Sequence, residues 1–296
     1  MKALGIDLGG TSAKIGLVED GQILNSASVP TRKDSDYEGI LGDIVKTSKQ
    51  LISNERIGSV GIGSPGLIDT ASGTVRYSNN IRWENAPLKD DIQKALGVPA
   101  YIANDAKCAA LGEAIYGAGA GYSRFAMLTL GTGVGGGFVV NGKLEEGTLY
   151  GDASGIYGHL TLYPDGRPCT CGRRGCLEAY CSARAVENKA QSILGRKVSA
   201  KAIFEAAANH NFVAEEIVDE FTRNLAVALV SLANILRPQC FAIGGGLSAD
   251  AEQFLPYVNE MLEKEVYGWA YAPVKAVRAK LGNTAGMIGA AALNRK

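Results

Sequence analysis

One histidine and three cysteines between residues 159 and 176 could bind a metal ion. Cys169 and Cys171 are separated by one residue, Cys176 follows after four more, and His159 lies ten residues before Cys169. Three thiolates and an imidazole provide the four ligands of a closed tetrahedral zinc site. Two glycines between the last two cysteines allow the tight turn that such a site requires. The spacing therefore predicts a structural Zn²⁺ site with these four residues as its ligands.

A disulfide and a redox pair are the alternatives for the same cysteines. The N-terminus, MKALGIDLGG, is interrupted by Asp7 and does not resemble a secretory segment, so we expect a cytoplasmic protein with reduced thiols. A redox pair would favour C-x-x-C, which the chain lacks. Cys181 lies in a helical stretch beyond the cluster, and we expect Cys108 and Cys240 to be core residues.

Composition excludes several classes of partner. The 296 residues include 30 Lys and Arg and 30 Asp and Glu, so the formal net charge is zero. We therefore expect no nucleic-acid partner and no attraction to an anionic membrane. The chain has no apolar run of the ~18 residues that a membrane span needs.

Two glycine-rich stretches have the same predicted structure. "ALGIDLGGTSAKIGLVEDGQIL" and "FAMLTLGTGVGGGFVVNGKL" each predict a strand, a glycine turn, a strand and an Asp-Gly or Asn-Gly hairpin. The copies start near residues 3 and 125, and such a repeat indicates a duplicated two-domain protein. A third glycine stretch, "GGGL", follows the predicted strand 240–243.

Glycine turns let backbone N–H groups approach phosphate oxygens, because no Cβ intervenes. "GTGVGG" fits the dinucleotide pattern G-x-G-x-x-G, but a strand follows it instead of the helix that such a site needs. No P-loop motif is present. If the glycines do more than form tight β-turns, they clamp a nucleotide, with Asp7 facing a phosphate-bound Mg²⁺. The candidate nucleotide-binding residues are Asp7, Gly9, Gly10, Thr11, Lys14, Gly131, Thr132, Gly133, Gly135, Gly136, Gly244, Gly245 and Gly246.

Asn104 and Asp105 lie where a predicted strand, 98–105, meets a predicted helix, 106–117. Aspartate is a good N-cap, and this role alone could account for Asp105. Beside a phosphate clamp, the carboxylate is also a candidate base that accepts a hydroxyl proton during phosphoryl transfer. Asn104 would then orient the same acceptor.

The motifs DLGGT, NNIRW, ANDA, LGTGVGGG and GH…CTCGRRGCLE together resemble the ROK family, in the right order and over nearly the whole chain. The resemblance implies an α/β fold of the actin/hexokinase (ribonuclease H-like) type, in which two duplicated domains close a cleft over ATP and a hexose. We expect a first domain of residues 1–118, completed by the C-terminal helix 284–296. The second domain would be 119–283 and include a zinc clip, residues 159–176.

The resemblance also implies an ATP-dependent, glucokinase-like hexose kinase that uses Mg²⁺ and a structural Zn²⁺. Asp105 matches the base that acts on the sugar 6-hydroxyl. Asn80, Asn104 and Glu178 match sugar-binding residues. His159 matches a zinc ligand that also lies against the sugar, since an imidazole can bind metal with one nitrogen and donate from the other. Relatives are often dimers or tetramers, so a homo-oligomer is expected.

One position departs from the family pattern. Family kinases have G-E-x-G-H where this chain has Gly155-Ile156-Tyr157-Gly158-His159. Ile156 stands where the family has a glutamate that accepts hydrogen bonds from the C1/C2 side of the sugar. Losing this acceptor should weaken binding of a free sugar by roughly 1–3 kcal/mol. Either Asp152 or Tyr157 replaces the contact, the substrate is a hexose modified at C1 or C2 (an N-acetylhexosamine or a β-glucoside), or the protein is a weak sugar or nucleotide sensor. The family's repressors carry an N-terminal helix-turn-helix, for which no room is expected before Asp7.

Overall fold

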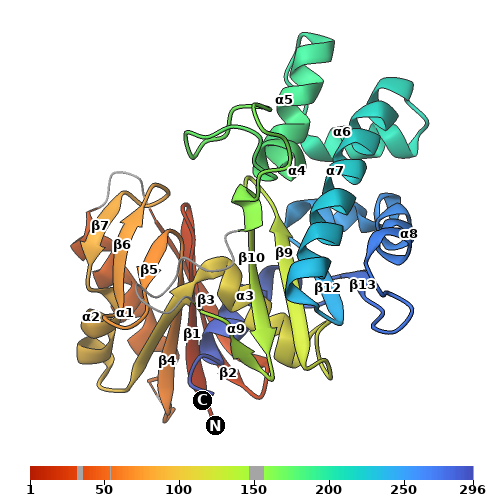
Figure 1. Cartoon of the computed structure of the whole chain (residues 1–296). Coiled ribbons are helices and arrows are strands. Elements are labelled where there is room, and N and C mark those ends of the chain that lie inside the picture. Colours follow the sequence, from red (N-terminus) through yellow and green to blue (C-terminus); the bar gives the residue numbers. More distant parts are fainter. Residues whose placement is uncertain (32–35, 54, 147–156, 296) are drawn as a thin grey trace. The chain divides into compact units, whose positions relative to one another are not determined.

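The computed structural model describes residues 1–31, 36–53, 55–146 and 157–295 (Figure 1). Its contacts divide the chain into two compact units. The first unit comprises 1–121, 137–155 and 283–296, and the second comprises 122–136 and 156–282. The expected boundaries assigned all of 119–283 to one domain, whereas the segment that begins at residue 137 groups with the first unit.

The first unit contains a mixed five-stranded sheet in which β1, β4 and β8 are parallel, whereas β2 is antiparallel to both of its neighbours. Pairing of β1 with β4 and of β4 with β8 is parallel, so these strands end at one edge of the sheet. All six residues of β4 are buried, as expected for a strand covered on both faces. The strands, in sheet order, are β3 (Gln22–Pro30), β2 (Ser12–Glu19), β1 (Ala3–Leu8), β4 (Ser59–Ser64) and β8 (Ala100–Asn104).

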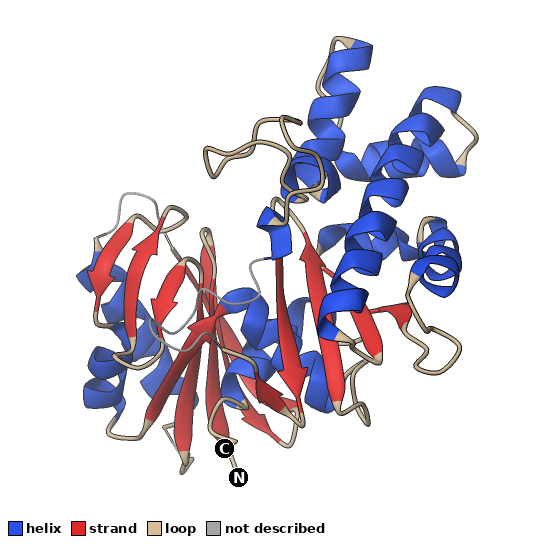
Figure 2. Ribbon diagram, viewed as in Figure 1, coloured by secondary structure: helices blue, strands red, loops and turns tan. Residues whose placement is uncertain are grey.

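A second, three-stranded sheet in this unit has the order β5 (Leu67–Asp69), β6 (Thr74–Ser78) and β7 (Trp83–Ala86). Figure 2 shows the strands of the large sheet with helices beside them. The helices of the first unit are α1 (Tyr37–Leu51), α2 (Leu88–Leu96), α3 (Asp105–Tyr116) and α9 (Ala285–Ala291).

Helix α9 packs closely against the sheet because the facing residues are small. A Cβ on Gly61 of β4 would lie 1.7 Å from the carbonyl oxygen of Ala290. A Cβ on Gly289 would lie 1.7 Å from the carbonyl oxygen of Cys108 in α3. The glycines therefore allow α9 to pack tightly against β4 and α3, the elements that lead to the site residues described below.

Both expected hairpins have the dihedral angles that their sequences favour. Asp20 and Gly21 have φ values of 47° and 81°, and Asn141 and Gly142 have 50° and 77°. Positive φ at both central residues is typical of a type I′ turn, which matches the twist of the flanking strands. The predicted strand–turn–strand–hairpin order is confirmed in both copies. In the second copy it comprises β9 (Arg124–Leu130), β10 (Val134–Val140) and β11 (Lys143–Leu144).

The second five-stranded sheet has the order β11, β10, β9, β12 (Cys240–Gly244) and β13 (Lys275–Arg278). Strands β9, β12 and β13 are parallel. The boundary between the two units falls inside β10, after Gly136. A strand follows the glycine turn directly, which excludes the dinucleotide-binding arrangement.

Helices make up most of the rest of the second unit. Helix α7 ends at Leu236, where Arg237 adopts a φ of 49° immediately before Pro238, so the predicted stop is confirmed. Phe204, Phe221 and Phe254 pack edge to face, with ring centroids 5.3–6.3 Å apart. The helices are α4 (Glu178–Cys181), α5 (Ala183–Leu194), α6 (Ala200–Ala208), α7 (Phe212–Leu236) and α8 (Leu255–Glu265), with 3-10 turns at Tyr157–His159 and Gly246–Gln253.

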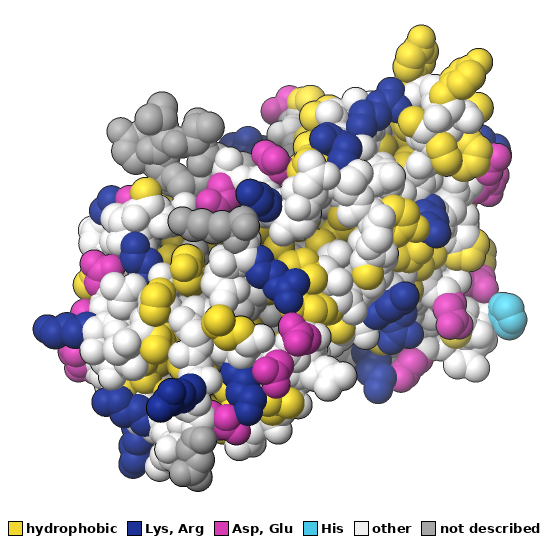
Figure 3. Space-filling view, turned by 90° about the horizontal axis from the view of Figure 1, so that it is seen from below, with side chains coloured by type: hydrophobic (Ala, Val, Ile, Leu, Met, Phe, Trp, Pro, Cys, Tyr) yellow, Lys and Arg dark blue, Asp and Glu magenta, His cyan; other side chains and the backbone are white. Residues whose placement is uncertain are grey.

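The face drawn in Figure 3 carries both basic and acidic side chains, scattered among apolar and neutral ones. This agrees with the zero net charge of the sequence. Among the described helices, none is both long and apolar enough to cross a membrane.

Candidate functional site

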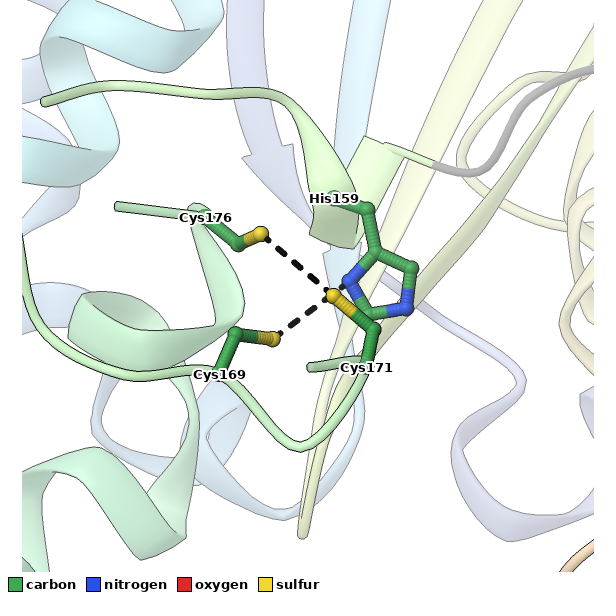
Figure 4. Close-up of side chains that lie close together, drawn as sticks. All are labelled: His159, Cys169, Cys171 and Cys176. Atoms are coloured by element: carbon green, nitrogen blue, oxygen red, sulfur yellow. Dashed lines mark hydrogen bonds between the residues drawn. The ribbon is translucent and has the colours of Figure 1, made fainter. Parts of the chain in front are cut away.

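The four expected zinc ligands converge in the second unit. The side chains of His159, Cys169, Cys171 and Cys176 point toward one another, and their ligand atoms all lie within 4.8 Å of each other (Figure 4). Cys181 lies outside this group, buried in α4 with its sulfur 3.6 Å from the carbonyl oxygen of Phe221. Cys108 and Cys240 are fully buried, as expected for core residues.

The distances within the cluster fit tetrahedral zinc. Two sulfurs that each lie about 2.3 Å from a tetrahedral zinc ion are about 3.8 Å apart. The sulfurs of Cys171 and Cys176 are 3.7 Å apart, and the Cys169 sulfur lies 3.7 Å from Nδ1 of His159. Since Nδ1 faces the sulfurs, Nε2 is the nitrogen available for another contact. The residues present therefore fit a Zn²⁺ ion.

Thiolates, not thiols, bind metal, and the cluster favours a thiolate at Cys171. Burial opposes this charge, but hydrogen bonds from the Arg173 backbone and from the side chains of Cys169 and Arg173 lower the pKa of Cys171 to about 7. Burial raises the pKa of Cys176, whose thiol is fully enclosed. A cation at the centre would favour the thiolate of both residues.

Backbone hydrogen bonds of the zinc clip hold the segments that carry His159 and Glu178, two expected sugar-binding residues, side by side. The N–H of Leu177 donates to the carbonyl of Leu160 over 2.8 Å, one residue before Glu178 and one after His159. Arg173 donates to the carbonyl oxygen of His159 over 2.7 Å. Gly175 has a φ of 75°, and a Cβ there would lie 1.6 Å from a neighbouring carbonyl oxygen, so the turn requires glycine.

Glu178, the first residue of α4, is held by two hydrogen bonds. Its Oε2 accepts from the N–H of Val134 over 3.0 Å, and its Oε1 accepts from the hydroxyl of Thr170 over 2.8 Å. A Cβ on Gly133 would lie 2.5 Å from Oε2. The carboxylate therefore lies against the glycine turn of the second copy and against the zinc clip.

Two glycine loops lie side by side in the second unit. Strands β9 and β12 pair in parallel through Thr129 and Gly244, so the turn 131–133 and the loop 244–246 leave the same sheet edge. Gly245 has a φ of 80°, and a Cβ there would lie 2.5 Å from the carbonyl oxygen of Leu130. The loops that the sequence separates by more than 100 residues are thus adjacent.

Gly135 and Gly136 belong to β10, whereas the sequence suggested that they form part of the turn. A Cβ on Gly136 would lie 2.4 Å from the carbonyl oxygen of Met127 and 2.6 Å from the ring of Tyr157. Close packing accounts for glycine at position 136. The turn itself consists of Gly131, Thr132 and Gly133.

The glycine turn of the first unit is closed by its own backbone and by one buried threonine. The N–H of Gly9 donates to the carbonyl of Ser12 over 2.9 Å. The Thr31 hydroxyl donates to the carbonyl of Gly9 over 2.7 Å, and its N–H donates to the carbonyl of Thr11 over 3.0 Å. Thr31 could not be predicted as part of this turn, because nothing in the local sequence distinguishes a threonine after Pro30.

Asp7 of β1 and Lys14 of β2 face each other in the register of the first hairpin. Burial raises the pKa of Asp7, and the positive charge of Lys14 partly opposes this shift. The Lys14 ammonium donates to the carbonyl oxygen of Asn283 over 3.3 Å. A buried carboxylate is an oxygen ligand of the kind that Mg²⁺ prefers, directly or through water.

Asn104, not Asp105, caps helix α3. The Asn104 side-chain oxygen accepts from the N–H groups of Ala106 and Lys107 over 3.0 and 3.4 Å, and its amide donates to the carbonyl of Gly66. Asp105 is the first residue of α3, and its Oδ1 accepts from the N–H of Ala106 over 2.9 Å. Interpreting Asp105 as the cap is therefore wrong.

The residues of the first unit that are expected to bind Mg²⁺ or sugar lie near one edge of its large sheet. Asp7 pairs with Gly63, and Ser64 with Asn104, so β1, β4 and β8 end together. Asn80 lies against the first glycine turn, since a Cβ on Gly10 would be 3.5 Å from its Cβ. The carboxyl edge of parallel strands is where α/β sheets bind ligands.

Asp152 and Tyr157 were proposed to replace the contact of the family's glutamate, and the structure describes only Tyr157. Ile156 itself and Asp152 lie outside the described residues. Tyr157 is 8% exposed, and burial raises the pKa of its hydroxyl. Its ring packs against Gly136, which favours a packing role for Tyr157.

Comparisons with known proteins agree with these motifs. The model of the ROK family matches residues 3–296. A glucokinase of Thermotoga maritima is 36% identical, over 99% of this chain and 97% of that protein. An N-acetyl-D-glucosamine kinase of Haemophilus influenzae is 33% identical over 98% of both chains. The crystal structure of a ROK family glucokinase from Streptomyces griseus with glucose and AMPPNP has a TM-score of 0.83 and 33% identity, and covers 100% of this chain and 99% of that one.

Proposed function

The chain belongs to the ROK family, and we propose that it is an ATP-dependent, glucokinase-like hexose kinase that transfers the γ-phosphoryl group to the 6-hydroxyl of the sugar. The fold supports this assignment, since each unit places a strand–glycine turn–strand motif at the carboxyl edge of its parallel strands. A duplicated pair of such turns suits a nucleotide with several phosphates.

The arrangement of Asn104 and Asp105 supports the chemistry most directly. Because Asn104 supplies the helix cap, the cap role does not account for an acid at position 105. Asp105 is only half-buried and begins a helix at the sheet edge that also holds the Asp7 turn. A carboxylate placed there can accept a proton from a bound hydroxyl group.

In the proposed step, the sugar 6-oxygen attacks the γ-phosphorus while its proton passes to the Asp105 carboxylate. The bond between the γ-phosphorus and the bridging oxygen breaks, and ADP leaves with the electron pair. Asn80, Asn104, His159 and Glu178 orient the hexose in this proposal. The backbone N–H groups of residues 10–11 and 132–133 contact the phosphates in this proposal, since those of Gly9 and Gly131 donate to carbonyls within their own turns.

Two metal ions would complete the site. Asp7 would hold Mg²⁺, which neutralises charge on the nucleotide phosphates when it is bound. His159 and the three cysteines would hold Zn²⁺, which keeps the zinc clip folded. Within the clip, the pairing of Leu160 with Leu177 then fixes the backbone on which His159 and Glu178 stand.

A coupled assay of ADP release tests the proposal. We expect wild-type protein to release ADP with glucose and Mg·ATP, and the Asp105→Asn variant to lose about 10²–10⁴-fold in kcat, the usual contribution of a general base. Glucose affinity, measured by calorimetry, should change little, because Asn keeps the shape of Asp. Wild-type turnover by Asp105→Asn would refute the role of Asp105.

An N-acetylhexosamine kinase is the second candidate. Ile156 replaces the family's charged acceptor with an apolar side chain, and one relative is named as an N-acetyl-D-glucosamine kinase. The test compares kcat/KM for glucose and N-acetylglucosamine in wild-type protein and in Ile156→Glu. If Ile156 determines the preference, the substitution shifts the ratio toward glucose by about tenfold or more. An unchanged ratio would exclude position 156 from substrate selection.

A further inference from the structure

Val134 is the point where the second glycine turn meets the segments that carry the expected sugar residues. It follows Gly133 directly and begins β10. Its N–H donates to Oε2 of Glu178 over 3.0 Å. A Cβ on Gly158, the neighbour of His159, would lie 2.1 Å from the Val134 carbonyl oxygen. The segments that carry Glu178 and His159 therefore both contact Val134, the residue directly after the turn.

The other end of the turn is held by the same part of the chain. The N–H of Ala183, the first residue of α5, donates to the carbonyl of Gly131 over 2.7 Å. Within the turn, the N–H of Gly131 donates to the carbonyl of Gly133 over 3.0 Å. The segment 178–183 thus bonds to the first and last residues of a four-residue stretch.

Glu178 is in turn fixed by the zinc clip. The hydroxyl of Thr170, which lies between Cys169 and Cys171, donates to Oε1 of Glu178 over 2.8 Å. With Oε2 on the Val134 N–H and Oε1 on Thr170, the carboxylate has one orientation that satisfies both donors. Val134 is only 7% exposed, so its N–H would lose a strong partner if the carboxylate were removed.

We propose that Glu178 is a positioning residue for the phosphate-binding turn 131–133, in addition to its expected contact with the sugar, and that Thr170 holds it in this position. The inference rests on the proposed function, in which this turn binds the donor phosphates. One carboxylate then contacts the acceptor sugar and orders the donor turn. Occupation of the sugar site consequently strengthens nucleotide binding, and the coupling is reciprocal.

Nucleotide affinity in the absence of sugar separates this role from a sugar contact. The probe is Mg·AMPPNP, titrated calorimetrically into the zinc-loaded protein. We expect Glu178→Ala to weaken binding about tenfold, because the Val134 N–H loses a charged acceptor. Glu178→Gln keeps an acceptor oxygen of the same reach and should bind within about twofold of wild type, while losing glucose affinity. A residue that only contacts sugar would leave nucleotide affinity unchanged in both variants.

Thr170 provides a milder test within the same experiment. Thr170→Val removes the hydroxyl at constant shape and should weaken nucleotide binding about threefold, whereas Thr170→Ser keeps the donor and restores wild-type affinity. Zinc content measured by mass spectrometry should stay the same in both, since neither is a ligand. The matched control is Glu216→Ala, an exposed glutamate of α7, which should bind as wild type does.

Wild-type nucleotide affinity in Glu178→Ala would overturn the proposal. If that variant does not fold, wild-type affinity in Thr170→Val overturns it instead. A wild-type protein that binds nucleotide but phosphorylates no hexose would refute the proposed function, while the affinities of the variants would still decide the role of Glu178. A wild-type protein that binds no nucleotide would refute both.

Discussion

Gly133→Ala should displace the Glu178 carboxylate without unfolding the protein. The new Cβ would lie 2.5 Å from Oε2, whereas ordinary contacts begin at about 3.4 Å, so the carboxylate must move by about 0.9 Å. Such a shift would lengthen the 3.0 Å bond from Val134 beyond the range of a hydrogen bond. Because the clash involves the end of a flexible side chain, the free energy of unfolding should change little.

The displaced carboxylate should bind sugar poorly. A hydrogen bond to a charged group contributes about 1.5–3 kcal/mol, which corresponds to about a ten- to 100-fold loss of glucose affinity. The assay is calorimetric titration of glucose into protein without nucleotide. The control is Gly131→Ala, two residues earlier, where a Cβ meets no atom within 4 Å and glucose affinity should be unchanged. Equal glucose affinities for Gly133→Ala and wild type would refute the placement of Glu178.

Two further predictions concern the metal sites. Burial raises the pKa of Asp7 above its usual value of 3.8, so the folded state loses stability as pH rises through the raised pKa. Asp7→Asn should therefore raise Tm at pH 7.5, and this gain should shrink as pH falls toward 4. A lower Tm of the variant at pH 7.5 would contradict the predicted sign of the effect. Mg·AMPPNP should stabilise the wild type but not the variant. Cys171→Ser removes an exposed zinc ligand and should reduce bound zinc from about one per chain to near zero, and lower Tm by about 5 °C or more. Full zinc occupancy in Cys171→Ser would exclude Cys171 as a ligand.

Local sequence patterns predicted much of the fold. Asp20-Gly21 and Asn141-Gly142 favour positive φ, so both hairpins and the strands beside them could be found from the sequence. The spacing of His159 and the three cysteines likewise predicted a four-ligand cluster, because short segments rich in glycine can close only over small distances. These features depend on residues that are near one another in the chain.

Long-range contacts could not be predicted in the same way. The Thr31 hydroxyl donates to the carbonyl of Gly9, which only the fold brings near, and the Thr170 hydroxyl donates to the carboxylate of Glu178. The sequence predicted Gly136 to be part of a phosphate-binding turn, but the position requires glycine because the Tyr157 ring and the Met127 carbonyl pack against it. The part of β10 after residue 136 groups with the first unit because of contacts with residues that are far away in the sequence. The local sequence therefore could not predict this boundary.

The identity of the reaction product tests the central claim most directly. ³¹P NMR of a mixture of protein, glucose and Mg·ATP should show ADP and a sugar phosphomonoester at the 6-position in equal amounts, and the Asp105→Asn variant should form both at least about 100-fold more slowly. ADP with inorganic phosphate in place of the sugar ester, or the same product from Asp105→Asn at the wild-type rate, would contradict a hexose kinase that uses Asp105 as its base.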